Sequence, residues 1–120
     1  MPLVEVEFIG KTEVETASFT RPIADKLGEI FKSPTACTWV RVRHTPATHY
    51  AENQSGNPRG ANAVFVTITL RELPDPASQA IQAREIAHAL TGISGIPSAQ
   101  VHLIYGPAAQ GRIALGGELS

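Results

Sequence analysis

The chain opens with the stretch MPLVEVEFI, residues 1–9, in which apolar and acidic side chains alternate. After Leu3, every second residue is valine or phenylalanine, and the residues between them are glutamates. A period of two is typical of a β-strand with one buried face and one face in water. The pattern therefore predicts an amino-terminal strand at the centre of the fold.

Pro2 directly follows the methionine at which the sequence starts. Removal of Met1, which a small second residue permits, would leave a secondary amine at the start of this strand. An α-amino group has an ordinary pKa of about 7.7–8.0, and apolar surroundings lower that pKa because they disfavour the charged form. Such an amine can take a proton from carbon near neutral pH. Pro2 is thus a candidate base, the alternative being a residue that is merely permitted at this position.

Composition restricts the class of protein. The 120 residues predict one domain over 1–120, and 42% hydrophobic with 18% charged residues favours a packed core over disorder. The net charge of −1 gives no electrostatic reason to expect nucleic acid or a membrane surface as partner. Cys37 is the single cysteine, which excludes an intrachain disulfide and a cysteine-based metal cluster. With no signal peptide or membrane span in the sequence, we expect a cytoplasmic protein.

The first helix is predicted after a turn at Gly10. Thr12 and Glu15 have the spacing of a capping box, and apolar residues then recur on one face as far as about residue 32. Pro22 interrupts this pattern, because an interior proline loses a hydrogen bond and clashes with the preceding turn. We therefore expect either a kink at Pro22 or a later helix start near Ser18.

Three more strands are expected over residues 37–44, 63–70 and 101–105, together with a second helix. Asp75 is a natural N-cap for that helix, and Gly92 is a natural C-cap. The buried face of this helix is predicted to hold Ala80, Ala83, Ile86, Ala87 and Leu90.

Two segments fall outside this pattern. Residues 45–62 read as a loop, which is long enough to suggest a functional role. The glycine-rich residues 111–119 predict a short hairpin at the end of the chain.

The order strand-helix-strand occurs twice, which suggests two copies of one β-α-β unit, residues 1–60 and 61–120. Pro34 and Pro97 occupy the same place in each copy, just after the helix. Right-handed crossovers would place the strands in one four-stranded sheet with both helices on one face, an α/β fold. The other face of the sheet then needs a partner, and oligomerisation would supply one.

These features resemble the tautomerase superfamily, and most closely 4-oxalocrotonate tautomerase. From Pro97 to Leu119 the sequence aligns with that family without a gap, and it ends similarly in Gly111 and then Gly-Gly-Glu-Leu at 116–119. The doubled length is similar to that of malonate semialdehyde decarboxylase, the cis-3-chloroacrylic acid dehalogenases and macrophage migration inhibitory factor. The resemblance implies a tautomerase-like fold and a homotrimer with three sites at subunit boundaries near Pro2.

In the superfamily, the mature proline moves a proton beside a carbonyl while arginines hold carboxylates, to which the planar guanidinium fork is suited. Arg71 resembles the arginine that follows the third strand in the decarboxylase and dehalogenase branches. The alternative is a strand-end arginine paired with Glu72 or Asp75. Arg41 and Arg43 share one strand face. We expect Arg41 to bind substrate across a subunit boundary, with a solvated face as the alternative.

Three further residues are candidates with alternatives. Lys11 lies in the turn where the tautomerase has a substrate-binding arginine, but a lysine lacks the fork. His102 stands where the family has a carboxylate-binding arginine, and a structural role is the alternative. Tyr50 falls near the position of an active-site phenylalanine, and simple packing is equally compatible with it. Because of these departures from the family pattern, the sequence does not establish that the chain acts on the dicarboxylate substrate of the tautomerase.

The predicted function is cofactor-free keto–enol tautomerisation of a small 2-oxo or 2-hydroxydienoic acid, with Pro2 as base and no metal, nucleic acid or membrane partner. One alternative is dehalogenation, hydration or decarboxylation of a small acid with protonated Pro2 as general acid. That chemistry needs a carboxylate to activate water, and Glu72 and Glu118 are the candidates. A non-enzymatic binding protein with the same fold is the third hypothesis.

Overall fold

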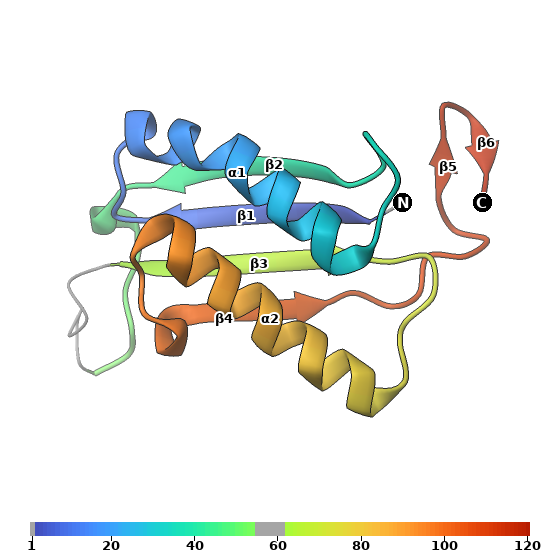
Figure 1. Cartoon of the computed structure of the whole chain (residues 1–120). Helices are drawn as coiled ribbons and strands as arrows, with labels where there is room; N and C mark the ends of the chain where they lie inside the picture. Colours follow the sequence, from blue (N-terminus) through green and yellow to red (C-terminus); the bar gives the residue numbers. More distant parts are fainter. Residues whose placement is uncertain (1, 55–61) are drawn as a thin grey trace.

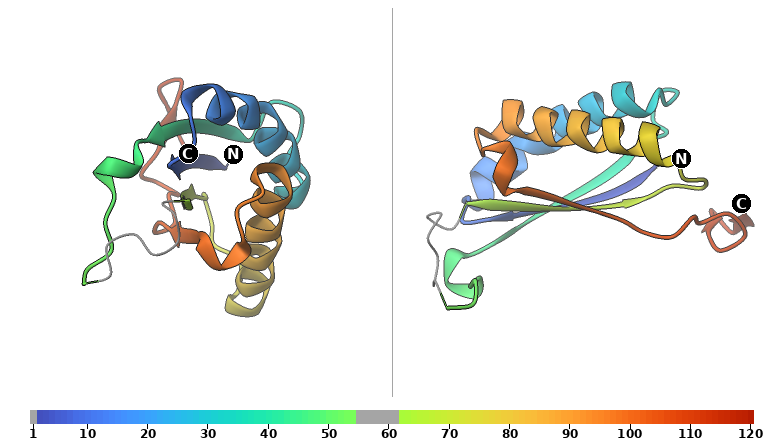
Figure 2. Two further views of the ribbon diagram at one scale, coloured as in Figure 1. Left: turned by 90° about the vertical axis from the view of Figure 1, so that its left-hand side faces the viewer. Right: turned by 90° about the horizontal axis from the view of Figure 1, so that it is seen from below.

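A computed structural model describes residues 2–54 and 62–120 (Figure 1). Four strands form one sheet in the order β2-β1-β3-β4, and both helices cover the same face of it (Figure 2). A separate two-stranded hairpin follows. The elements are β1 Leu3–Ile9, α1 Glu13–Phe31, β2 Trp39–Thr45, β3 Ala63–Thr69, α2 Pro76–Ser94, β4 Val101–Tyr105, β5 Ala114–Leu115 and β6 Glu118–Leu119, with short 3₁₀ turns η1 Ala47–His49 and η2 Ser98–Gln100.

The two halves of the chain meet at the centre of the sheet. β1 is parallel to β2, and β3 is parallel to β4, as expected for two β-α-β units. β1 and β3 are antiparallel, and Val6 lies opposite Val66 at the middle of that pair. The start of β1 therefore lies beside the end of β3. The predicted α/β fold class and the arrangement of strands and helices are confirmed.

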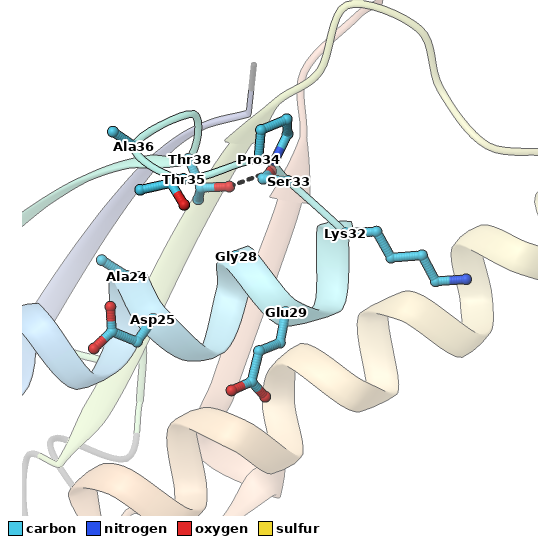
Figure 3. Close-up of a pocket in the computed structure, with 10 residues that line it drawn as sticks. All are labelled: Ala24, Asp25, Gly28, Glu29, Lys32, Ser33, Pro34, Thr35, Ala36 and Thr38. Atoms are coloured by element: carbon cyan, nitrogen blue, oxygen red, sulfur yellow. Dashed lines mark hydrogen bonds between the residues drawn. The ribbon is translucent and has the colours of Figure 1, made fainter.

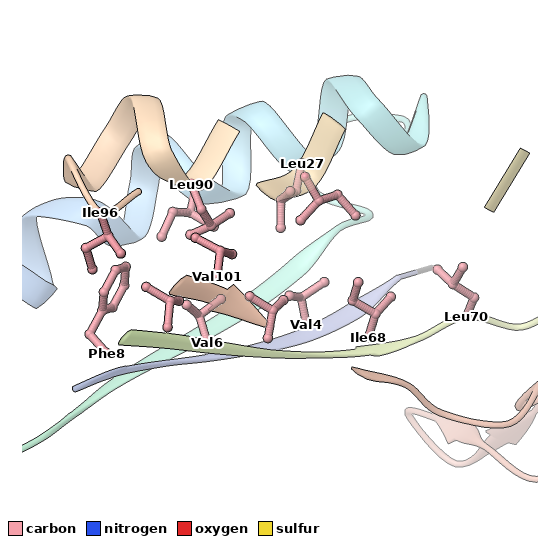
Figure 4. Close-up of a cluster of buried hydrophobic side chains, with 13 residues drawn as sticks. Val4, Val6, Phe8, Leu27, Ile68, Leu70, Leu90, Ile96 and Val101 are labelled. Atoms are coloured by element: carbon pink, nitrogen blue, oxygen red, sulfur yellow. The ribbon is translucent and has the colours of Figure 1, made fainter. Parts of the chain in front are cut away.

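The helix-facing side of the sheet forms the core (Figure 4). The alternation in β1 puts its valines and Phe8 under the helices, where their side chains are at most 1% exposed. Each such side chain contributes about 1.5–3 kcal/mol by leaving water. The remaining members of the core come from both helices and the neighbouring strands: Ile23, Leu27, Val64, Val66, Ile68, Leu70, Ile86, Leu90, Ile96 and Val101.

The first helix begins where its capping box predicts. The Thr12 hydroxyl accepts from the Glu15 N–H, and the Glu15 carboxylate accepts from the Thr12 N–H, both at 3.1 Å. Of the two alternatives expected at Pro22, the later start near Ser18 is wrong, because the helix runs through Pro22 from Glu13 to Phe31. The reciprocal cap fixes the first turn, so one missing interior hydrogen bond does not displace the start.

The second helix begins as predicted and ends later. The Asp75 carboxylate accepts from the Ser78 N–H at 3.0 Å. The predicted end at Gly92 is wrong, because the helix continues to Ser94 and is capped by Gly95 in the left-handed conformation, with φ of 78°. Ala80 is exposed, against expectation, whereas Ala89 is buried in the core-facing stripe.

Strand limits shift by one or two residues from those expected. β2 starts at Trp39 rather than Cys37, because the chain first turns through a hydrogen bond from the Cys37 N–H to the Pro34 carbonyl. β3 ends at Thr69, and Leu70 is buried just beyond it. The predicted loop contains the 3₁₀ turn η1, and residues 55–61 lie outside the described part of the chain.

The chain ends in the hairpin that the glycines predict. Gly116 and Gly117 form the two-residue connection, with φ of 59° and 87°. Positive φ at both positions is the geometry that matches the twist of paired strands, and glycine adopts it without strain. The hairpin projects beyond the end of the sheet that carries the amino terminus (Figure 1).

The second face of the sheet carries mixed side chains. Arg41 lies opposite Glu5 and forms an ion pair with it, and Arg43 lies opposite Glu7. Within the described residues, both helices lie on the other side, so this face has no covering layer (Figure 2). Neither described helix combines the length and apolar character of a membrane span.

Candidate active site

Pro2 lies immediately before β1 and is buried. Its carbonyl accepts a hydrogen bond from the Trp39 N–H at 3.0 Å, which extends the β1–β2 ladder by one residue. The ring is therefore held at the edge of the core. Met1 lies outside the described residues, so its expected removal stays a prediction.

A pocket of about 330 Å³ brings Pro2 and Arg71 together. The antiparallel pairing of β1 and β3 explains this, because Arg71 follows the end of β3 and Pro2 precedes β1. None of the ion pairs found among the described residues includes Arg71, so the alternative pairing with Glu72 or Asp75 is not formed. The other lining residues are Phe31, Lys32, Ser33, Pro34, Leu70, Glu72, Pro74 and Gln82.

Lys32 is a pocket residue that sequence reasoning missed. It caps α1 in the left-handed conformation, with φ of 55°, at the point where the chain leaves the helix and passes Pro2. Lys32 and Arg71 together give the pocket two cations, against one carboxylate from Glu72. A net positive lining of this kind favours a small anionic ligand.

A second hollow shares Lys32, Ser33 and Pro34 with the Pro2 pocket (Figure 3). It has a volume of about 590 Å³ and lies between α1 and the turn that precedes β2. The Thr38 hydroxyl donates to the Ser33 hydroxyl there at 2.5 Å, and Lys32 extends away from it toward α2 (Figure 3). This hollow is larger, but neither Pro2 nor Arg71 lines it, so the smaller pocket is the better candidate site.

Gln82 enters the Pro2 pocket from α2, and a residue on β4 holds it. The Tyr105 hydroxyl donates to the Gln82 Oε1 atom at 2.7 Å. Burial raises the pKa of the Tyr105 hydroxyl above its ordinary value, so it remains a protonated donor at neutral pH. Sequence reasoning missed Gln82 as well, although a polar residue in line with Ile86 and Leu90 on a buried helix face was an available signal.

Arg41 lies away from this pocket. Its side chain is exposed on the open face of the sheet, where it pairs with Glu5 and borders a shallow hollow with Arg43. An exposed ion pair of this kind contributes little to stability. Within one chain, the structure does not bring Arg41 to Pro2.

Tyr50, His102 and Lys11 lie at the opposite end of the sheet. Tyr50 donates to Glu52 at 2.9 Å and packs on Phe65, with ring centroids 6.0 Å apart. His102 packs against the same phenylalanine ring, with ring centroids 5.3 Å apart. The seven residues of β1 span about 20 Å between the two ends of the sheet. A role for these three residues beside Pro2 would therefore require a second chain.

Two other kinds of site, a metal centre and a phosphate-binding loop, have no support in the described residues. Within residues 2–54 and 62–120, histidine, cysteine and acidic side chains form no group of three or more with the arrangement of a metal site. The Gly116–Gly117 pair is the turn of the terminal hairpin, not a loop between a strand and a helix. The Pro2 pocket itself is lined by the ring of Pro2 and by the polar side chains of Arg71, Lys32, Glu72 and Gln82, among others.

Comparisons with solved structures find the same architecture throughout the chain. A fused 4-OT described as a wild-type symmetric trimer matches with a TM-score of 0.79 and 15% identity over 98% of this chain and 94% of that chain. Macrophage migration inhibitory factor from Oncomelania hupensis matches at 0.76 and 16%, over 99% and 82%. Malonate semialdehyde decarboxylase matches at 0.72 and 15%, over 95% and 90%.

Comparisons of the sequence give no match. No protein-family model matches the chain. No curated protein matches it either. The three solved structures all belong to the tautomerase superfamily, so the resemblance predicted from the sequence is confirmed at the level of the fold.

Proposed function

From the tautomerase fold as premise, we propose that this chain is a cofactor-free keto–enol tautomerase of a small 2-oxo or 2-hydroxydienoic carboxylic acid. The observation that carries the proposal is the pocket that holds Pro2 and Arg71 together. A buried amino-terminal proline and an arginine that forms no ion pair within the described residues are the two groups that such a reaction needs.

Pro2 is proposed to move the proton once Met1 has been removed. Burial of the ring would favour the neutral form of the freed amine over the charged form. In the enol-to-keto direction, the nitrogen accepts the hydroxyl proton, which leaves the electron pair of the O–H bond on oxygen as an enolate. An oxygen electron pair then forms the C=O bond while the C=C electron pair takes the proton from the charged nitrogen at carbon, which restores the neutral amine. No other reactant enters the step.

Arg71 and Lys32 are proposed to bind the carboxylate. The guanidinium can hold both carboxylate oxygens at once, whereas the Lys32 ammonium acts as a point charge. Both cations also favour the negative charge that develops on the substrate when its proton moves. Binding and stabilisation thus come from the same two side chains.

We further propose a homotrimer. One structural neighbour is described as a symmetric trimer, and the open sheet face and the projecting hairpin leave surfaces for other copies of the chain. In such an assembly, Arg41, Tyr50, His102 and Lys11 of one chain could meet the Pro2 pocket of another.

A second candidate function is decarboxylation or hydration of a small acid. The observation that favours it is Glu72, which lines the Pro2 pocket and could activate water while a protonated Pro2 acts as general acid. Glu118, the other carboxylate considered for this role, lies in the terminal hairpin and does not line the pocket.

Intact mass and phenylpyruvate enol–keto tautomerisation, measured on wild type and Pro2→Ala, test the proposal. We expect a mass without methionine and a loss of about 10²- to 10⁴-fold in kcat for the variant, the range typical of a lost general base. Pro107→Ala is the matched control, because Pro107 is exposed outside the pocket. Retained methionine, or a Pro2→Ala variant as active as wild type, would leave only the binding-protein hypothesis.

The same samples distinguish the two enzymatic functions. Release of carbon dioxide from a 3-oxo acid, lost in both Pro2→Ala and Glu72→Gln, would favour the decarboxylase. Tautomerisation that is lost in Pro2→Ala but retained in Glu72→Gln would favour the tautomerase.

A further inference from the structure

A second residue fixes the orientation of Gln82 in the pocket, as Thr38 does for the Ser33 hydroxyl. Its Oε1 atom accepts from the Tyr105 hydroxyl at 2.7 Å. Within the described residues, no hydrogen bond engages the Gln82 amide N–H groups. The side chain therefore carries two donors on an amide whose oxygen end is held.

We propose that Gln82 is the neutral hydrogen-bond donor for the keto or enolate oxygen of the substrate, and that Tyr105 is its positioning residue. This inference rests on the tautomerase function proposed above. It adds a division of labour: the cations Arg71 and Lys32 hold the carboxylate, whereas Gln82 contacts the oxygen at which charge develops.

The direction of the hydrogen bond between Tyr105 and Gln82 supports the assignment of Gln82 as a donor. A glutamine amide has one acceptor end and one donor end, so a donor at Oε1 leaves the nitrogen for other partners. Tyr105 can serve as that donor because burial raises the pKa of its hydroxyl and keeps the proton in place. Tyr105 extends from β4 on the helix-facing side of the sheet, so the core holds its ring while the hydroxyl reaches α2.

Preorganisation makes Gln82 a better candidate than Lys32 for the oxygen. A donor stabilises a transition state most when its orientation is fixed before the reaction, because no reorganisation is then needed. Lys32 is exposed, and a lysine stem is flexible. Gln82 is half-buried and tied to the sheet.

The inference also narrows the substrate class. A neutral amide donor matches a carbonyl or enol oxygen better than it matches a second carboxylate, to which a charged fork is suited. The pocket therefore favours a monocarboxylic 2-oxo acid over a dicarboxylic acid.

The test compares steady-state kinetics of wild type, Gln82→Leu, Tyr105→Phe and the double variant with the enol of phenylpyruvate. We expect kcat of Gln82→Leu to fall about 10- to 100-fold while KM changes less than about threefold, because the carboxylate contacts remain. Tyr105→Phe should lower kcat by about 3- to 10-fold. The double variant should be no slower than Gln82→Leu, because Tyr105 acts only through Gln82.

Gln79→Leu provides the matched control. Gln79 precedes Gln82 on the same helix and does not line the pocket, so its replacement should leave kcat within about twofold of wild type. Gln82→Met, which keeps the length of the side chain and removes the amide, replaces Gln82→Leu if that variant does not fold.

The outcomes separate this inference from the proposed function. Gln82→Leu with the kcat of wild type, beside an inactive Pro2→Ala, would overturn the inference and leave the tautomerase standing. Additive losses in the double variant would overturn the positioning role of Tyr105. Activity that does not depend on Pro2 would overturn the proposed function, and the inference with it.

Discussion

The two ends of the sheet have the same arrangement of strands but carry different side chains. At one end, β3 finishes beside the start of β1, and Arg71 follows two residues after β3. At the other end, β1 finishes beside the start of β3, and Lys11 follows two residues after β1. The antiparallel central pair thus places a cation at each end. We call the first the Pro2 end and the second the Lys11 end.

The helices show where the two ends diverge. Phe19 in α1 and Gln82 in α2 occupy the same position in their 19-residue helices. Phe19 packs on the buried ring of Phe8 with centroids 5.1 Å apart, which fills the Lys11 end with aromatic side chains. Gln82 lines the pocket of the Pro2 end. One duplicated layout therefore supports packing at one end and a polar pocket at the other.

The largest effect on stability is expected from removing a buried aromatic side chain at the Lys11 end. Phe8→Ala should lower the free energy of unfolding by about 3–5 kcal/mol, because Phe8 is fully buried and its loss leaves a cavity. Urea denaturation measures the change. Val14→Ala is the control, because Val14 is 80% exposed and should change the free energy by less than about 0.5 kcal/mol. A loss below 1 kcal/mol for Phe8→Ala would show that this end is not a packing site.

The next effect tests the Pro2 end. Arg71→Ala should lower kcat/KM about 10- to 100-fold, mainly through KM, because it removes a charged hydrogen-bonding partner of the carboxylate. Arg84→Ala provides the comparison, since Arg84 is exposed on α2 outside the pocket. Equal losses in both variants would contradict the assignment of Arg71. A loss in Lys11→Ala as large as that in Arg71→Ala would indicate that the Lys11 end completes the site of a neighbouring chain.

The smallest effect concerns the helix caps, one at each end of the sheet. Hydrogen bonds from the backbone of Thr12 lower the pKa of Glu15, and those from Ser78 lower the pKa of Asp75. A carboxylate with a lower pKa in the folded state stabilises fully above its unfolded pKa. That contribution is lost as the pH falls through the folded pKa.

Acid unfolding therefore reports on both caps. Between pH 6 and pH 3, the urea midpoint of Glu15→Gln and of Asp75→Asn should fall less than that of wild type, by a small margin because both carboxylates are exposed. Glu85→Gln, in the middle of α2, is the matched control. If either cap variant lost stability as steeply as wild type, its carboxylate would not contribute through the cap.

The features that local rules govern could be predicted from the sequence. Alternation in β1, the capping box at Thr12 and the N-cap at Asp75 each depend on residues within one turn or one strand. To predict that Pro2 and Arg71 lie close together, local rules were not enough. That prediction also needed the resemblance to a family built from two β-α-β units. Once that layout was assumed, the end of the third strand had to lie near the start of the first.

The features that were predicted wrongly or missed depend on contacts between elements that are distant in the sequence. Gly92 and Gly95 are both acceptable helix ends in the sequence, and packing beyond Gly92 selects the second. Lys32 and Gln82 line the Pro2 pocket because α1 ends and α2 begins beside it, which no periodicity reveals. The expected places of Arg41 and Tyr50 beside Pro2 assume a second chain, and one sequence does not give the geometry of an assembly.

The antiparallel pairing of β1 with β3, here called the seam, affects how the chain folds. Each β-α-β half joins strands through its own helix, but the seam joins strands from opposite halves of the chain. Such long-range pairing is slow to form, because the entropy of closing the chain is lost before the contacts form. The same strand pairing would be satisfied between two molecules that exchanged halves. Short hinge connections favour such an exchange, whereas the sequence between β2 and β3 is long, over residues 46–62.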